Sequence, residues 1–115
     1  MTLTLSAHPE LPALFSTNDQ GAIGALTGLR QAGAVGKVKV VAYDAAGAEV
    51  SAFKNGGIQA LIAQNPKQEG DVAMESAAKL IKGDKLDKTT LTEIVTIKSG
   101  DTATADKYEY KGDCD

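Results

Sequence analysis

The sequence of 115 residues contains few of the side chains that catalyse reactions or bind metals. It has one His, one Cys and no Trp, and its aromatic residues are two Phe and three Tyr. The histidine, His8, precedes the first expected strand, so we find no general base of suitable pKa near a strand end. Neither a Gly-x-Gly-x-x-Gly motif nor a phosphate loop occurs, and no cluster of ligands would hold zinc. We therefore expect a protein that is not an enzyme and has no metal or cofactor.

The chain also lacks an excess of positive charge and a long apolar run. Its formal net charge is −3 and its pI is about 5.1, which argues against a nucleic-acid surface of clustered Lys and Arg. No apolar run approaches the roughly 20 residues of a membrane span. Residues 1–5 have neither the basic start nor the apolar segment of a signal peptide, which indicates the cytoplasm for a complete chain and nothing for a fragment.

The single cysteine, Cys114, stands one residue from the end of the sequence. We expect an exposed thiol there. The alternative is a disulfide partner lost from a longer exported chain.

Apolar periodicity predicts the order strand, helix, strand, helix, strand, helix, strand. Expected strands are residues 14–17, 37–44, 58–64 and 91–97, and expected helices are residues 20–32, 48–54 and 66–82. Strand–helix alternation with short loops favours a parallel sheet with right-handed crossovers. The apolar run of the second strand favours burial on both of its faces. The sequence therefore predicts an α/β domain with an open, mainly parallel sheet of about four strands and helices on both faces.

The third expected helix has the best-marked ends in the chain. Asn65 can cap it, Pro66 fits the first helical position, and Gln68 stands where a capping-box partner would. The stripe that we expect this helix to bury consists of Ala73, Ala77, Leu80 and Ile81.

Two later segments are expected to be solvated. In residues 83–90, Lys and Asp alternate, which favours a solvated loop over a basic binding site. From Ser99 onward the chain is polar. We therefore expect residues 1–98 to form the folded lobe and residues 99–115 a polar, poorly packed tail.

Polar side chains follow the first three expected strands. The first strand ends in Asn18-Asp19, the second in Asp44, and the third in Gln64-Asn65. The carboxyl ends of parallel strands share one edge, which is where ligands bind in open α/β sheets. Asp accepts hydrogen bonds, and Asn and Gln both donate and accept, so the set suits a ligand covered in hydroxyl groups. Each residue alone is more commonly a cap, turn or loop residue. Their coincidence favours a binding crevice, and either residue of the Asn-Asp pair could be the ligand contact or the helix cap.

Three segments carry recognisable motifs: FSTNDQGAIGAL at residues 15–26, VVAYD at residues 40–44 and FKNGGIQALIAQNP at residues 53–66. They resemble corresponding segments of the type I periplasmic sugar-binding proteins, the ribose-binding group in particular. The resemblance covers roughly residues 8 to 98 of this sequence, and these correspond only to the carboxyl-terminal part of the family's longer chains. It implies half of a flavodoxin-like, type I periplasmic-binding-protein fold, in which Asn18, Asp44 and Gln64 contact the hydroxyls of a monosaccharide. With Asn18 as a ligand contact, we expect Asp19 to be the helix cap. Ala42 and Tyr43 replace the family's usual Gly and Phe.

Members of this family are much longer than this chain and have two lobes. The resemblance therefore implies a partial lobe with half a binding site, whose third helix would pack on the missing amino-terminal lobe or be covered in a homodimer of the fragment. For the parent protein it implies an ABC-importer receptor that docks with a membrane permease, as a periplasmic protein or an extracellular lipoprotein. The alternative is the effector-binding domain of a lactose-repressor-type transcription regulator, which shares the fold.

Overall fold

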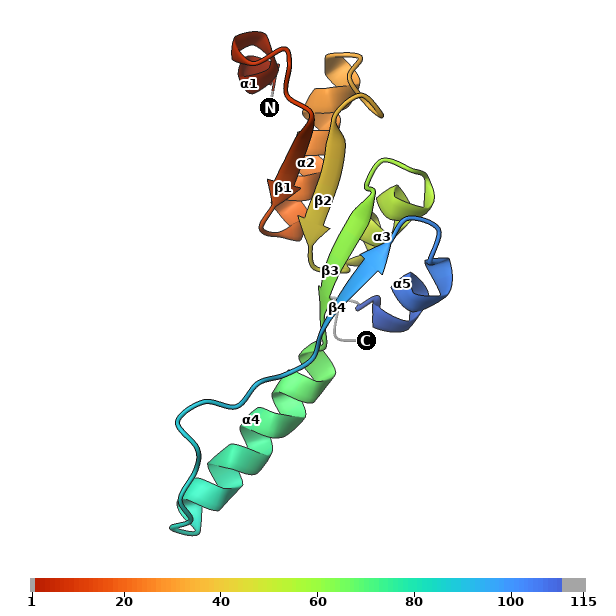
Figure 1. Cartoon of the computed structure of the whole chain (residues 1–115). Coiled ribbons are helices and arrows are strands. Elements are labelled where there is room, and N and C mark those ends of the chain that lie inside the picture. Colours follow the sequence, from red (N-terminus) through yellow and green to blue (C-terminus); the bar gives the residue numbers. More distant parts are fainter. Residues whose placement is uncertain (1, 111–115) are drawn as a thin grey trace.

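The computed structural model of the chain describes residues 2–110, which form one sheet with helices (Figure 1). The strands are β1 (Ala13–Ser16), β2 (Lys39–Tyr43), β3 (Ala60–Gln64) and β4 (Ile94–Lys98). The helices are α1 (Thr2–Ala7), α2 (Asp19–Gln31), α3 (Gly47–Lys54), α4 (Pro66–Ile81) and α5 (Thr102–Tyr108). The predicted α/β fold with an open, mainly parallel four-stranded sheet is confirmed. Our expectation for Cys114 lies outside the described residues.

The strands lie in chain order across the sheet, and the last one runs against the others. β1 and β2 are parallel, and so are β2 and β3. β4 is antiparallel to β3, with Ile94 opposite Gln64 and Lys98 opposite Ala60. A strand parallel to β3 would require a crossover connection that packs on a face of the sheet. Instead, α4 extends beyond the edge of the sheet, and residues 82–93 lead the chain back along it to β4 (Figure 1). The sheet is therefore mainly parallel, as we expected, with one antiparallel strand at its edge.

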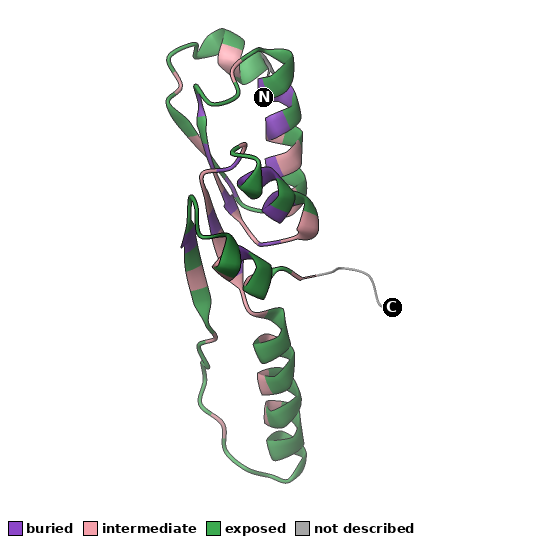
Figure 2. Ribbon diagram, turned by 90° about the vertical axis from the view of Figure 1, so that its right-hand side faces the viewer, coloured by how far each residue is buried: buried purple, intermediate pink, exposed green. Residues whose placement is uncertain are grey.

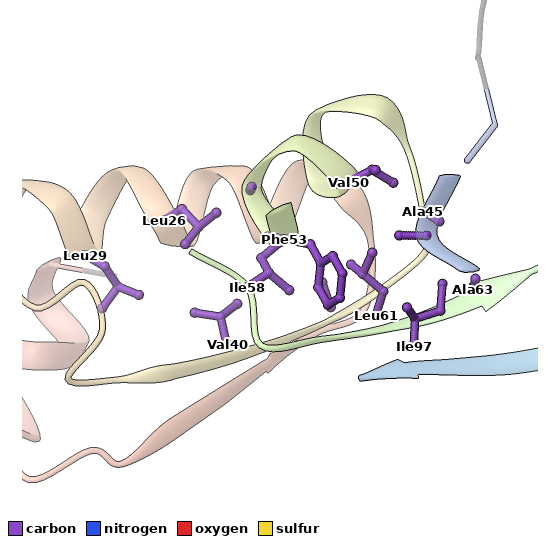
Figure 3. Packing of buried hydrophobic residues seen from close by; sticks show 14 of the residues in the cluster. Leu26, Leu29, Val40, Ala45, Val50, Phe53, Ile58, Leu61, Ala63 and Ile97 are labelled. Atoms are coloured by element: carbon purple, nitrogen blue, oxygen red, sulfur yellow. The ribbon is translucent and has the colours of Figure 1, made fainter. Parts of the chain in front are cut away.

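One face of the sheet is buried, and the other is partly open. Val40 and Ala42 of β2 are buried against the helices, whereas Val41 and Tyr43, which point the other way, are half-buried. On the same open face Phe15 is 56% exposed. We expected helices on both faces and a fully buried second strand. Among residues 2–110, however, α2, α3 and α5 all lie on one face of the sheet (Figures 2 and 3). Alternate residues of β2 are therefore buried and half-buried.

The core lies between this buried face and the three helices (Figure 3). Ile23, Leu26 and Leu29 lie at helical spacing on α2; Leu26 and Leu29 are buried and Ile23 is half-buried. Each buried aliphatic or aromatic side chain stabilises the fold by about 1.5–3 kcal/mol. The remaining large core residues are Val40, Val50, Phe53, Ile58, Leu61 and Ile97.

α4 has the ends that the sequence predicts. Oδ1 of Asn65 accepts a hydrogen bond from the backbone N of Gln68 at 3.1 Å, and Pro66 is the first residue of the helix. Oε1 of Gln68 accepts instead from the backbone N of Glu93 at 2.8 Å. The capping box that we expected is therefore replaced by a contact between α4 and the segment that leads into β4.

α4 protrudes from the rest of the molecule (Figures 1 and 2). None of its residues is buried, and Met74, Leu80 and Ile81 are 73%, 60% and 88% exposed. The radius of gyration is 17.6 Å, compared with about 13 Å for a compact domain of about 100 residues. The buried stripe expected from the helical spacing is therefore not buried in this chain. Its exposure agrees with what the family resemblance implies.

The segment after β4 is more ordered than the sequence suggests. Residues 102–108 form α5, where Oδ1 of Asp101 caps the helix by accepting from the backbone N of Thr104 at 3.1 Å. Ala105 is fully buried, and Asp106 pairs with Lys54 of α3. Up to residue 110 the segment thus differs from the poorly packed tail that we expected.

Candidate ligand-binding site

The carboxyl ends of the three parallel strands meet at one edge of the sheet, as we expected. Gln64 is the last residue of β3 and Asp44 follows β2, and Nε2 of Gln64 donates a 2.6 Å hydrogen bond to Oδ1 of Asp44. Both residues are half-buried. Asn18 precedes α2 and is exposed, and within residues 2–110 no hydrogen bond joins it to Asp44 or Gln64. The structure therefore pairs two of the predicted residues directly and places the third at the same edge.

Asn18, not Asp19, is the cap of α2. Oδ1 of Asn18 accepts a hydrogen bond from the backbone N of Gly21 at 2.7 Å. Asp19 is the first residue of the helix, and its Oδ1 accepts from the backbone N of Gln20 at 2.7 Å. Our assignment of the cap to Asp19 is wrong. Because the oxygen of the Asn18 amide holds the helix start, its Nδ2 is the group left to donate to a ligand.

Gly21 makes room for this cap. A Cβ atom at position 21 would lie 2.7 Å from Oγ of Ser16 and 3.0 Å from Oδ1 of Asn18. Ser16 in turn donates a 2.9 Å hydrogen bond to the carbonyl oxygen of Asn18. The glycine after the Asn-Asp pair therefore serves the close approach of β1 to α2, whereas Gly24 faces open space.

Asp44 has an unusual backbone conformation for a residue with a side chain. Its φ is 107°, and it is the one non-glycine residue with positive φ in the described chain. Such conformations cost about 1–3 kcal/mol, and they cluster at functional sites. The backbone N of Asp44 donates to the carbonyl oxygen of Ile62 at 3.0 Å, so β3 holds both the main chain and the side chain of this residue.

Glu49, on α3, is a buried acidic residue that the sequence analysis did not identify. Its side chain is 0% exposed, and Oε2 accepts a 3.2 Å hydrogen bond from the backbone N of Ala46. Burial raises the pKa of Glu49 to about 7; the hydrogen bond from Ala46 lowers it, and the charges of Asp44 and Asp19 raise it further. Its place three residues after Ala46 is a capping-box position, but Ala46 cannot complete the box and the pattern gives no indication of burial.

Tyr110 also lies near this edge, in the segment that we expected to be a poorly packed tail. Its backbone N donates to the carbonyl oxygen of Ala45 at 3.2 Å. Burial raises the pKa of its phenol, and so do the charges of Asp44, Asp19 and Glu49. Tyr110 lines a hollow of about 300 Å³ whose wall also includes Gln64, Asn65, Glu93 and Tyr108. The carboxyl-terminal segment thus borders the predicted site.

The arrangement is suited to hydrogen bonding with a polar ligand. Asp44 supplies an acceptor, the amide of Gln64 can both donate and accept, and Nδ2 of Asn18 can donate. Across residues 2–110, no group of three or more His, Cys, Asp or Glu side chains is placed to hold a metal ion. None of the helices described for these residues is long and apolar enough to cross a membrane.

Comparison with known families identifies the fold. Residues 1–85 match the family described as periplasmic binding protein domain. The chain belongs to this family. Asn18, Asp44 and Gln64 all lie within the matched residues, whereas β4 and α5 lie beyond them.

Individual members of the periplasmic binding protein family are similar to this chain over part of their length. The ribose import binding protein of Salmonella typhimurium (strain LT2) is 43% identical over 82 residues, which are 71% of this chain and 27% of that protein. An ABC transporter solute binding protein from Agrobacterium vitis, bound with alpha-D-tagatopyranose, superposes with a TM-score of 0.86 at 29% identity. That comparison covers 94% of this chain and 37% of the other.

A second solved structure agrees with the first. It is a periplasmic solute binding protein of an ABC transporter from Actinobacillus succinogenes 130z with bound D-allose, and its TM-score is 0.82 at 32% identity. The match covers 90% of this chain and 37% of that one. This chain therefore spans well under half the length of the relatives that it matches.

Proposed function

We propose that this chain is a sugar-binding lobe, in partial form, of the solute-binding protein of an ABC importer. In this proposal Asn18, Asp44 and Gln64 hydrogen-bond the hydroxyls of a monosaccharide from three strand ends. The hydrogen-bonded pair of Gln64 and Asp44, at the carboxyl edge of a periplasmic-binding-protein sheet, is the observation that carries the proposal. Relatives named for ribose import, and relatives solved with bound D-allose or tagatopyranose, support the ligand class.

The chemistry of the three residues fits sugar hydroxyls, each of which donates and accepts. Gln64 already satisfies Oδ1 of Asp44, so Oδ2 is the atom that would accept from the sugar. An ionised acceptor forms shorter and stronger hydrogen bonds than a neutral one, which makes Asp44 the anchor. Nδ2 of Asn18 adds a donor, because its Oδ1 is committed to the start of α2.

The other wall of the site would come from a second lobe. The exposed Met74, Leu80 and Ile81 give α4 an apolar surface outside the core, and we infer that the amino-terminal lobe of a longer parent protein covers it. That parent would close on its sugar by hinge motion and present the closed form to a membrane permease. We propose that it is exported, as a periplasmic protein or an extracellular lipoprotein.

Titration of the isolated chain tests the half-site. Calorimetry with pentoses and hexoses should give millimolar affinity or no detectable heat, because only one wall is present. Tight binding by the monomer would contradict the half-site. Sedimentation in the same buffer separates the two ways of covering α4: a monomer agrees with a missing lobe, and a stable dimer indicates that a second copy of the chain takes its place.

A completed receptor tests the residues. This chain would replace the matched 82-residue segment of the Salmonella ribose import binding protein, and the chimera would be titrated with D-ribose and D-allose. Asp44→Ala should weaken binding about tenfold or more, since a hydrogen bond to a charged group contributes about 1.5–3 kcal/mol. Asp84→Ala, in the exposed loop after α4, is the matched control and should leave affinity unchanged. Equal affinities of the two variants would remove Asp44 from the site.

A further inference from the structure

Glu49 has a buried carboxyl group that no contact in the proposed sugar site explains. Its side chain is fully buried on α3. Oε2 accepts from the backbone N of Ala46, but Oε1 has no hydrogen-bond partner in the described part of the chain. A buried polar atom without a partner destabilises a fold. Burial of Glu49 therefore lowers the stability of the fold, which points to a role for this residue at the turn that contains Ala46.

The turn in question presents Asp44. Ala46 lies two residues after Asp44, which has the positive φ of 107°. Four hydrogen bonds hold the main chain: Asp44 donates to Ile62, the carbonyl oxygen of Ala45 accepts from Tyr110, the carbonyl oxygen of Ala46 accepts from Val50, and the backbone N of Ala46 donates to Glu49. The bond to Glu49 is the one made by a side chain. Ala46 itself provides no side-chain cap for α3.

We propose that Glu49 is a positioning residue: its protonated carboxyl group anchors the backbone of Ala46, holds Asp44 in its left-handed conformation, and releases the turn when it ionises. The consequence for ligand binding rests on the proposed function, in which Asp44 is the anchor for the sugar. The hold on the turn itself does not depend on any ligand.

The loss of hydration on burial is the main reason why an ionised Glu49 would leave its position, and the charges of neighbouring carboxylates add to it, whereas the hydrogen bond from Ala46 acts in the opposite direction. Asp44 on the turn and Asp19 at the start of α2 are the carboxylates that act on it, and the phenol of Tyr110 lies in the same field. The phenol is neutral at these pH values, so an ionised Glu49 would be buried near two like charges, those of Asp44 and Asp19. The carboxylate recovers its hydration free energy when it moves into water, and the backbone N of Ala46 then loses its hydrogen-bond acceptor. With the pKa of Glu49 at about 7, the hold is present in mildly acidic solution and weakens above neutrality.

Hydrogen exchange of the Ala46 amide in the ligand-free chain tests the hold on the turn. Its protection, measured relative to the unstructured rate at each pH, should fall about tenfold between about pH 5.5 and about pH 8.5, as the buried carboxyl ionises. Glu49→Gln keeps the acceptor without a charge, so protection should persist across the range. Glu49→Met removes the acceptor, and protection should be low at every pH. Glu75→Gln, on the exposed α4, should follow the wild-type profile.

The Gln variant decides the outcome even if the Met variant does not fold. A Glu49→Gln chain that loses protection with rising pH as the wild type does would overturn the proposal. So would a wild-type chain whose Ala46 protection is the same at both ends of the pH range.

A titration with D-allose in the chimeric receptor separates this proposal from the proposed function. Affinity should fall above neutral pH in the wild type and stay constant in Glu49→Gln. If Asp44→Ala leaves affinity unchanged while Ala46 exchange follows Glu49, the proposed function fails and the hold on the turn stands. If binding needs Asp44 but has the same pH profile in both proteins, Glu49 is not its positioning residue.

Discussion

The side-chain amide of Gln64 is hydrogen-bonded to the carboxylate of Asp44 over 2.6 Å, which ties the carboxyl end of β3 to the residue that follows β2. This hydrogen bond fixes the direction of a carboxylate whose backbone already has a restricted, left-handed conformation. A polar group held in this way loses little conformational freedom when it binds a ligand, so this part of the proposed site is preorganised.

Replacing Gln64 by Leu should destabilise the chain. The substitution removes the donor and leaves Oδ1 of the half-buried Asp44 without its partner, which should lower the free energy of unfolding by about 1–2 kcal/mol. Urea unfolding monitored by circular dichroism measures the change. Gln31→Leu, at the exposed end of α2, is the control and should stay within about 0.5 kcal/mol of the wild type. Equal effects of the two substitutions would show that the bond to Asp44 contributes nothing.

A pair of substitutions at Asp44 should separate backbone strain from the role of its carboxylate. Both Asp44→Gly and Asp44→Ala remove the bond from Gln64, but only glycine adopts a φ of 107° without strain. We therefore expect the Gly variant to be more stable than the Ala variant by about 1–2 kcal/mol, measured by urea unfolding. In the chimeric receptor both should bind sugar equally poorly. An Ala variant as stable as the Gly variant would mean that the turn relaxes without cost.

Stability should fall as pH rises toward neutrality because of Glu49. Its pKa is about 7 in the folded chain and 4.5 ordinarily, so between these values the folded state binds more protons than the unfolded state. The stabilisation is fully present below about pH 4.5 and declines as pH rises through about 7, by up to about 3 kcal/mol. Urea midpoints for wild type and Glu49→Gln should converge below about pH 4.5, separate progressively up to about pH 7, and keep a constant difference above it. Parallel curves for the two proteins would contradict the assignment.

The ends of the long helices were predictable, because local residues determine them. Asn65 and Pro66 begin α4 as their types indicate, and the apolar spacing of α2 gives its buried face. The three strand ends could be grouped for a similar reason: parallel pairing brings them to one edge whatever the details of packing. Their pairing distances, and the cap at Asn18 in place of Asp19, depend on side-chain geometry that spacing does not determine.

The direction of β4 and the burial of Glu49 depend on contacts far apart in the sequence. Whether β4 is parallel to β3 is decided by where the chain returns after α4, and no residue near Ile94 encodes that. α5 is short and polar, with Ala105 as its buried residue, so periodicity could not separate it from a tail. In the sequence, Glu49 is an ordinary acidic residue of a helical first turn. Its burial results from the packing of segments that are distant in the chain.

The packing of α5 can be tested at Ala105. This residue is fully buried, whereas Ala103 on the same helix is exposed. Ala105→Asp would bury a carboxylate without a partner and should cost about 3 kcal/mol or more, while Ala103→Asp should stay within about 0.5 kcal/mol of the wild type. Differential scanning calorimetry of the three proteins measures the difference. Equal melting temperatures for the two variants would show that α5 does not pack against the core.

The protrusion of α4 makes its folding a separate equilibrium. A helix of 16 residues that buries none of them against the core has little beyond its own backbone hydrogen bonds to keep it ordered, and helices of about this length are marginal alone in water. Heating should therefore fray α4 before the sheet melts. A partner that binds this helix, such as the second lobe proposed above, would also supply the free energy that orders it. The cost of ordering the sixteen residues of α4 would then be subtracted from the affinity of that partner.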